Sequence, residues 1–311
     1  MNQSRAALAA IAVVIPLAMV ATAYTGRPPQ QVSQEQEKVT VVASFYPLYE
    51  FASRVGGDRV DVSSLVPAGI EPHDWEPTPQ DKLRVQSASM FVINGVGFES
   101  WADNMEASVV VDTSVGSELE HEGEIEEDGQ GHEGGVNPHI WLDPVLAKHQ
   151  VEKIRDALAM ADPENTNYYA QNAAEFAVEL DQLDAFIRLE LGDCEKSDFI
   201  AFHDAFAYFA ERYDLTQHSI HDVSPEGEIL PQRMQEIIEL ANELGINVVY
   251  SEDLVDSRLA DTIAGEIPGG RVLVLSPIEG IDQKDRALGI AYIEKMKQNV
   301  ETLKVGLECT Y

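Results

Sequence analysis

Basic residues are scarce in this chain. Its 311 residues include 21 Lys and Arg against 54 Asp and Glu, which gives a formal net charge of −33. Binding to nucleic acid, or to anionic lipid through a polybasic patch, requires a basic surface. We therefore expect neither partner. The excess of carboxylates favours solubility and attracts cations, and a 44% apolar content is sufficient for a folded core.

Cysteine is nearly absent too, since the chain has only Cys194 and Cys309. Two cysteines without a Cys-x-x-Cys spacing do not provide a cysteine-based zinc site. In an exported chain a single pair favours one disulfide, closing a loop of about 115 residues. Two free thiols are the alternative.

The common catalytic motifs are also missing. The sequence contains no nucleophile elbow Gly-x-Ser-x-Gly, no His-Glu-x-x-His, no phosphate-binding loop and no Gly-x-Gly-x-x-Gly. We therefore expect that the protein is not an enzyme. An exported zinc-dependent hydrolase is the alternative, in which Glu71, Glu76 or Glu252 would serve as the general base.

The N-terminus has the pattern of an export segment. Residues 6–24 carry no charge and are mostly apolar, and Ala21-Thr22-Ala23 resembles a small-x-small cleavage site. Residues 26–38 are polar and typical of a tether. We expect an extracytoplasmic protein that is either secreted after cleavage or anchored in the membrane through the apolar segment.

Strand-like and helix-like segments alternate along the rest of the chain. Short β-branched or apolar runs predict strands, and amphipathic segments between several of them predict helices. The runs form two sets, at 39–43, 60–66, 90–94 and 109–111, and at 199–202, 247–250 and 271–275. This alternation predicts an α/β fold of two similar lobes, each with a mostly parallel sheet flanked by helices.

One long helix is predicted between the two sets. Residues 164–191 contain neither Gly nor Pro, and their apolar side chains recur every three or four residues. A single helix of that length is a rigid connection. We therefore assign 1–38 to the export segment and tether, 39–162 to the N-terminal lobe, 163–193 to the connecting helix, and 194–311 to the C-terminal lobe.

Three histidines stand in distinctive positions. His73 and His139 lie in proline-rich loops, and His203 directly follows a predicted strand. Ligands bind beyond the carboxyl ends of strands in open α/β sheets, and imidazole is the commonest metal ligand near neutral pH. Three imidazoles with a carboxylate or water suit Zn²⁺ better than Mn²⁺ or Ca²⁺. The alternative is three hydrogen-bonded structural histidines. His149, His218 and His221 lack such a context, although His218 and His221 could lie near the same crevice as further ligands.

An acidic segment separates the first two of these histidines. Residues 118–133 include eight acidic residues, two His and three Gly. Such a composition cannot bury enough apolar surface to order itself, so it predicts a loop. The loop is either a solvated insertion or a weak gatherer of cations.

Several motifs of this sequence resemble those of a known protein family. The motifs PHDWEPTP (72–79) and NPHIWLDP (137–144), with SFYPLYEF (44–51) and SPEGEILP (224–231), resemble the zinc/manganese class of ABC-transporter substrate-binding proteins. The resemblance extends over residues 39–311. It implies two lobes joined by a rigid helix, a metal ion bound between them, and delivery of that ion to an ABC permease. We expect a monomer that carries Zn²⁺ as its transported ligand. Manganese or iron uptake is the alternative, and the same scaffold also allows surface adhesion.

The resemblance also implies a set of metal ligands. The histidines of the family's motifs match His73, His139 and His203. The fourth ligand of the family is often an Asp in a Leu-Asp-Pro sequence, where this chain has Leu275-Ser276-Pro277. Water, Glu71 or Glu279 are candidates to replace it.

Two further expectations accompany this assignment. Carboxylates such as Asp143, Asp204 or Glu252 would orient the imidazole rings, and metal binding would weaken below about pH 6, as histidine becomes protonated. Some zinc-binding members of the family contain a disulfide in the second lobe, which fits Cys194 and Cys309.

Overall fold

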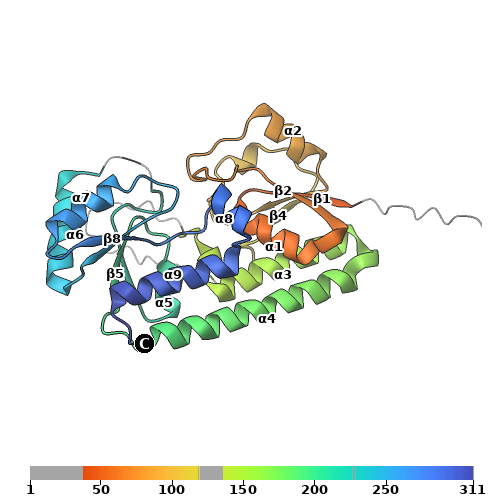
Figure 1. The fold of residues 1–311 in the computed structure, drawn as a ribbon. Helices are drawn as coiled ribbons and strands as arrows, with labels where there is room; N and C mark the ends of the chain where they lie inside the picture. The colour runs from red at the N-terminus through yellow and green to blue at the C-terminus, as the bar shows by residue number, and fades with distance from the viewer. Residues whose placement is uncertain (1–37, 118, 120–135, 226, 228, 311) are drawn as a thin grey trace, which may run out of the picture. The chain divides into compact units, whose positions relative to one another are not determined.

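The computed structural model describes residues 38–117, 119, 136–225, 227 and 229–310 (Figure 1). The predicted export segment and nearly all of the tether lie outside the described residues. The acidic loop does too, apart from Leu119. Within the described ranges, no helix has both the length and the apolar character needed to cross a membrane.

The first half of the chain forms a four-stranded parallel sheet with strand order β2-β1-β3-β4. Its strands are β1 (Val39–Ala43), β2 (Val60–Ser64), β3 (Met90–Ile93) and β4 (Val110–Asp112). The associated helices are α1 (Tyr46–Gly56), α2 (Pro79–Ser87) and α3 (Pro144–Ala161). β1 lies at the centre, where Val41 pairs with Val62 on one side and Met90 on the other. Its last three residues, 41–43, are buried because a parallel sheet is covered on both faces.

The second half repeats this arrangement with strand order β6-β5-β7-β8, again all parallel. The strands are β5 (Asp198–Ala201), β6 (Thr216–Ser219), β7 (Val248–Ser251) and β8 (Arg271–Val274). The helices are α5 (Ala207–Arg212), α6 (Pro231–Leu244), α7 (Arg258–Glu266), α8 (Gln283–Leu288) and α9 (Tyr292–Leu307). β6 was not predicted, because Thr216-Gln217-His218-Ser219 has no apolar residue and forms a strand only by pairing with β5.

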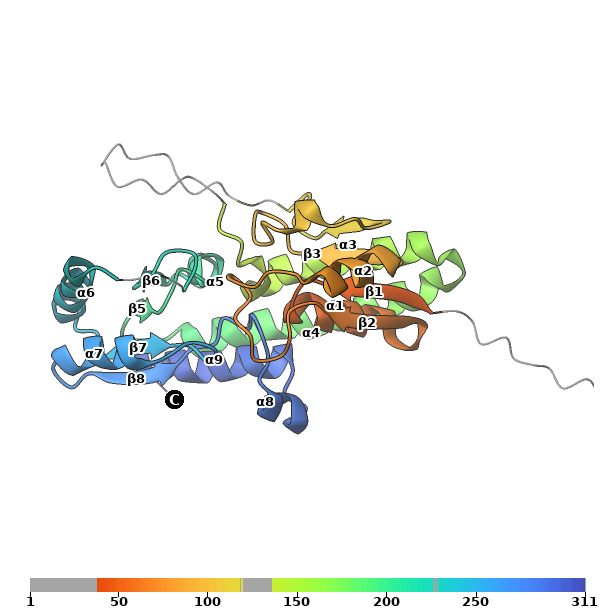
Figure 2. The same cartoon turned by 90° about the horizontal axis from the view of Figure 1, so that it is seen from above.

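A single helix, α4 (Thr166–Leu191), connects the two halves. Its buried face includes the predicted apolar stripe, which consists of Ala173, Phe176, Leu180, Leu183, Ile187 and Leu191. Figures 1 and 2 show α4 running past both sheets beside α9, and α1, α3 and α9 pack against it. One continuous core extends along this helix from Val41 to Leu307. The predicted fold class is therefore confirmed, while the limits proposed for each lobe stay a prediction.

A disulfide links the residues that follow α4 and α9. Cys194, just after α4, is bonded to Cys309, just after α9, across 115 residues of sequence. The backbone of the same two residues forms an isolated antiparallel bridge. The predicted disulfide is thus confirmed, and it joins the end of the connecting helix to the end of the C-terminal helix.

Candidate metal centre

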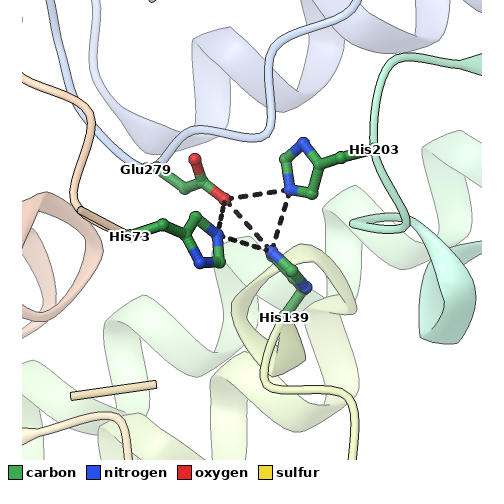
Figure 3. Close-up of side chains that lie close together, drawn as sticks. All are labelled: His73, His139, His203 and Glu279. Carbon is green, nitrogen blue, oxygen red and sulfur yellow. Dashed lines mark hydrogen bonds and ion pairs between the residues drawn. The ribbon is translucent and has the colours of Figure 1, made fainter. Parts of the chain in front are cut away.

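Four side chains from four separate segments meet at one point (Figure 3). His73 comes from the loop between β2 and α2, and His139 from the turn before a short 3-10 helix at Ile140–Leu142. His203 follows β5, and Glu279 lies in the loop between β8 and α8. The three predicted histidines are therefore brought together, and a carboxylate joins them.

The four ligand atoms all lie within 4.8 Å of one another. The Nε2 atom of His139 lies 3.3 Å from Nε2 of His73 and 3.0 Å from Nε2 of His203. Oε1 of Glu279 lies 3.1 Å from the Nε2 atoms of His73 and His139, and 3.3 Å from that of His203. A tetrahedral Zn²⁺ with bonds of about 2.0–2.1 Å needs ligand atoms roughly 3.3 Å apart. The donor set and its spacing fit this ion.

The centre is almost closed to solvent. The side chains of His139, His203 and Glu279 have no exposed surface, and that of His73 is 9% exposed. Phe98 and Trp141 line one side, with ring centres 5.0 Å from His73 and 5.0 Å from His139 respectively. Such an apolar wall excludes water and strengthens the electrostatic attraction between the ligands and a cation.

The loop that carries His73 is fixed locally. The backbone N–H of His73 donates to Oε1 of Glu71 over 2.9 Å. The loop ends in a capping box, in which the hydroxyl of Thr78 accepts from the backbone of Asp81 and Oδ2 of Asp81 accepts from the backbone of Thr78. This box starts α2 and sets the exit of the loop.

Hydrogen bonds behind two of the rings orient them. Nδ1 of His139 lies 2.8 Å from Oδ1 of Asn137, an acceptor, so this nitrogen carries the proton and Nε2 presents its lone pair. Nδ1 of His203 lies 2.5 Å from Oε1 of Glu252. Asn137 was not predicted, although a side-chain amide two residues before a histidine in such a turn is a usual local acceptor for its backbone N–H.

The other two carboxylates expected behind the rings have different partners. The carboxylate of Asp204 accepts from the side chain of Asn137, so it lies one contact further from His139. Asp143 pairs with Arg212 and caps α3 by accepting from the backbone of Val145. The prediction that Asp143 orients a metal-binding ring is therefore wrong, because its two oxygens are taken by Arg212 and the helix start.

Burial and neighbouring charges set the protonation of His139, His203 and Glu279. Burial, aided by the neighbouring His203 and opposed by Glu279, lowers the pKa of His139 to about 3. Burial also disfavours charge on His203, but Glu252 and Glu279 together raise its pKa well above the usual value. The pKa of Glu279 is held well below its usual value by His73 and His203, despite its burial. Without metal, the centre at neutral pH contains an ionised Glu279, a neutral His139 and a protonated His203.

Glu71 was a candidate for the fourth ligand, and Ser276 stands where the family's Asp would be; neither joins the four-atom group. Burial and the nearby Glu279 raise the pKa of Glu71 to about 9, so it is protonated at neutral pH. The hydroxyl of Ser276 instead donates to Oδ2 of Asp253 over 2.8 Å. Of the candidates named from sequence, only Glu279 places an oxygen among the imidazoles.

The remaining described histidines have structural partners. His149 contacts the backbone oxygen of Val115, and His218 contacts Oδ1 of Asp198 at 2.8 Å. The ring of His221 packs on Phe202, with 4.9 Å between ring centres. These three lie outside the four-atom group, so the possibility that His218 or His221 lies among the ligands is not borne out.

Comparison with known sequences gives a consistent result. A family model described as the periplasmic zinc-uptake complex component A, ZnuA, matches residues 41–306. The chain is 37% identical over 283 residues to the high-affinity zinc uptake system protein ZnuA of Bacillus subtilis (strain 168), covering 87% of this chain and 88% of that protein. It is 35% identical to the zinc-binding protein AdcA of Streptococcus pyogenes serotype M6, of which the alignment covers 56%.

Solved structures agree with the sequence relatives. The Zn(II)-bound ZnuA-like domain of Streptococcus pneumoniae AdcA superposes with a TM-score of 0.75 at 31% identity, covering 88% of this chain and 100% of that one. A laminin-binding protein (Lmb) of Streptococcus agalactiae, described as having adhesin and metal transporting activity, gives 0.77 at 29% identity, covering 87% and 100%. Since the family model spans most of its length, the chain belongs to the family of the zinc-uptake complex component A, a family of solute-binding proteins for zinc rather than of enzymes.

Proposed function

We propose that the protein captures Zn²⁺ outside the cytoplasm through His73, His139, His203 and Glu279 and delivers it to an ABC permease. The observation that carries the proposal is the spacing of three imidazole nitrogens and one carboxylate oxygen, which lie 3.0–3.3 Å apart in the pairs given above. These distances match the edges of a four-coordinate zinc site, about 3.3 Å long.

Zinc fits this ligand set better than manganese or iron. Three of the four donor atoms are imidazole nitrogens, which suit a borderline-soft ion, whereas Mn²⁺ prefers oxygen donors. The Zn(II)-bound structure of the related Streptococcus pneumoniae domain supports the same choice.

Carriage fits the centre better than hydrolysis. A catalytic zinc ion needs three protein ligands and an open position for water. With Glu279 as the fourth ligand, the ion would be enclosed by protein atoms, and the buried ring of side chains leaves it no free corner. We therefore propose that the protein has no hydrolytic activity.

Partners and location follow from the family role. A zinc-uptake component works with a membrane permease, so we propose an ABC permease as the recipient. We also propose that the protein acts as a monomer and that residues 1–38 direct its export, either as a cleaved signal or as an anchor. The periplasmic description of the family model supports a place outside the cytoplasm.

Zinc titration of the purified protein against a competing chelator tests the proposal. We expect one tightly held Zn²⁺ per chain, and a loss of affinity of at least a hundredfold in His139→Ala and in His203→Ala. His149→Ala is the matched control, because His149 is a histidine outside the centre. Unchanged affinity in both site variants would contradict the ligand assignment, and a preference for Mn²⁺ over Zn²⁺ would contradict the choice of metal.

A further inference from the structure

The loop that supplies Glu279 contains an unusual turn. Ile278, directly before Glu279, has a φ of +56°, in the left-handed region that β-branched residues rarely adopt. Such a conformation persists only where the surrounding structure holds it in place. The residues that contact the turn therefore help to orient the carboxylate of Glu279 toward the imidazoles.

Ser276 and Asn299 provide the first part of this support. The backbone N–H of Ser276 donates to Oδ1 of Asn299 over 2.9 Å, and Nδ2 of Asn299 donates to the carbonyl of Ser276 over 2.6 Å. Both residues are buried, with 3% and 4% of their surface exposed. The paired bonds attach the start of the turn to helix α9.

The hydroxyl of Ser276 provides the second part. It accepts from the backbone N–H of Ile278 over 3.2 Å and donates to Oδ2 of Asp253 over 2.8 Å. The same Oδ2 accepts from Nζ of Lys295 over 3.0 Å, so the acceptor is itself fixed. One hydroxyl thereby links the strained residue to a charged pair between the β7–α7 loop and α9.

The indole of Trp141 holds the middle of the turn. Its Nε1 donates to the carbonyl of Pro277 over 2.7 Å. Trp141 lies two residues after His139, and the ring centres of these two residues are 5.0 Å apart. The turn that carries the carboxylate is therefore attached to the segment that carries one of the imidazoles.

We infer that Ser276 and Asn299 are positioning residues that set the affinity of the centre for Zn²⁺ by fixing the turn that carries Glu279. The inference rests on the proposed function, since it takes Glu279 as a zinc ligand. Ser276 lies outside the four-atom group. Its hydroxyl faces Asp253, and it acts through the backbone that leads to the carboxylate three residues later. Residues behind a metal ligand commonly change affinity ten- to a hundredfold when replaced.

A double-mutant cycle tests this role with Zn²⁺ itself as the probe. Zinc affinity is measured by chelator competition for the full chain and for the variants Ser276→Ala, Glu279→Gln and the double variant. We expect Ser276→Ala to weaken binding roughly tenfold in the parent chain and to have almost no effect in the Glu279→Gln background. Asn299→Ala provides a second variant with the same expected pattern.

Ser114→Ala is the matched control. Ser114 is also a buried serine whose hydroxyl donates to a carboxylate, that of Asp112, over 2.6 Å, but it lies in the turn that follows β4. It should leave zinc affinity unchanged. An equal loss from Ser276→Ala with and without Glu279 would indicate general damage to the lobe and overturn the inference, as would no loss at all. Full affinity in Glu279→Gln would remove the ligand on which the inference rests. A loss confined to the histidine variants would still leave zinc capture as the function.

Discussion

Oε1 of Glu252 lies 2.5 Å from Nδ1 of His203, and both side chains are buried. Because Glu252 and Glu279 stabilise its charged form, the pKa of His203 is raised well above the usual 6.5 despite its burial. The imidazole must lose that proton before Nε2 can bind an ion. The contact therefore ties zinc capture to proton release.

The first prediction concerns this proton. At pH 7 we expect zinc binding to release close to one proton from His203, and affinity to decline with falling pH from above pH 6.5 rather than only below pH 6. Calorimetric titrations in two buffers of different ionisation enthalpy measure the released protons. Glu252→Gln should reduce the number released. A binding enthalpy that is the same in both buffers would contradict this expectation.

A second prediction concerns Glu99, a buried carboxylate outside the metal centre. It accepts from the hydroxyl of Ser44 over 2.6 Å and from the backbone of Asn94 and Gly95 over 2.8 and 3.2 Å. Burial raises its pKa from 4.5 to about 7, so the folded state binds the proton more tightly than the unfolded state. The resulting stabilisation is fully present below about pH 4.5 and is lost as pH rises through about 7, a change of about 3 kcal/mol.

Thermal unfolding measured from pH 5 to pH 8 tests the predicted contribution of Glu99 to stability. We expect Glu99→Gln to remove this contribution, so that the variant loses less stability than the parent as pH rises. Parallel pH profiles for the two proteins would show that Glu99 does not titrate in this range.

A third prediction concerns Asn94, which connects β3 to the turn of His139. Its Nδ2 donates to the carbonyl of Pro138 over 2.8 Å, and its Oδ1 accepts from Gln150 over 2.9 Å. Asn94→Ala leaves both partners buried without these bonds, which should lower the free energy of unfolding by about 1–3 kcal/mol and weaken zinc binding roughly tenfold.

Denaturant unfolding and zinc titration of the same samples measure both effects. Asn172→Ala serves as the control, since this asparagine also donates to a backbone carbonyl, that of Val55, but on the connecting helix. The control should lose stability without losing zinc affinity. If the two variants behave alike toward zinc, Asn94 has no specific effect on the centre.

A fourth prediction concerns the disulfide. Replacing Cys194 and Cys309 together by Ser should lower the free energy of unfolding by about 2–4 kcal/mol, because the open chain gains conformational entropy when unfolded. Zinc affinity should stay within about twofold, since no ligand segment is bonded to either cysteine. Chemical denaturation with and without reductant measures the change in the free energy of unfolding. Chelator competition measures zinc affinity. A large loss of affinity would mean that the bridge shapes the centre.

Much of this architecture could be predicted from local patterns. The apolar spacing of α4 follows the helical period, and the β-branched runs of β1 and β3 mark buried strands, so both were predicted from sequence. β6 was missed because its stability comes from pairing with β5 and not from its own polar residues. Local periodicity cannot reveal an edge strand of this kind.

In the candidate site, too, some residues could be predicted from local sequence and others depend on tertiary contacts. The three histidines could be identified because proline-rich turns and a strand end place them in recognisable contexts. Glu279 stayed one of three alternatives, because its position depends on a positive φ at Ile278 and on contacts with Asn299, 23 residues beyond Ser276. Nothing in an isoleucine predicts that backbone conformation. The fourth ligand is set by tertiary structure and not by a motif.

The residues that supply the ligand atoms are far apart along the chain, so the chain must fold before the four atoms can bind one ion. His73 and Glu279 are separated by 206 residues, and the turn before Glu279 is held by α9, close to the C-terminus. A nascent or translocating chain has only isolated imidazoles and carboxylates, each with weak affinity for zinc. On the proposed function, the ion would be acquired only after synthesis is complete and both sheets have formed. On the proposed export route, the chain would therefore cross the membrane before its zinc site exists.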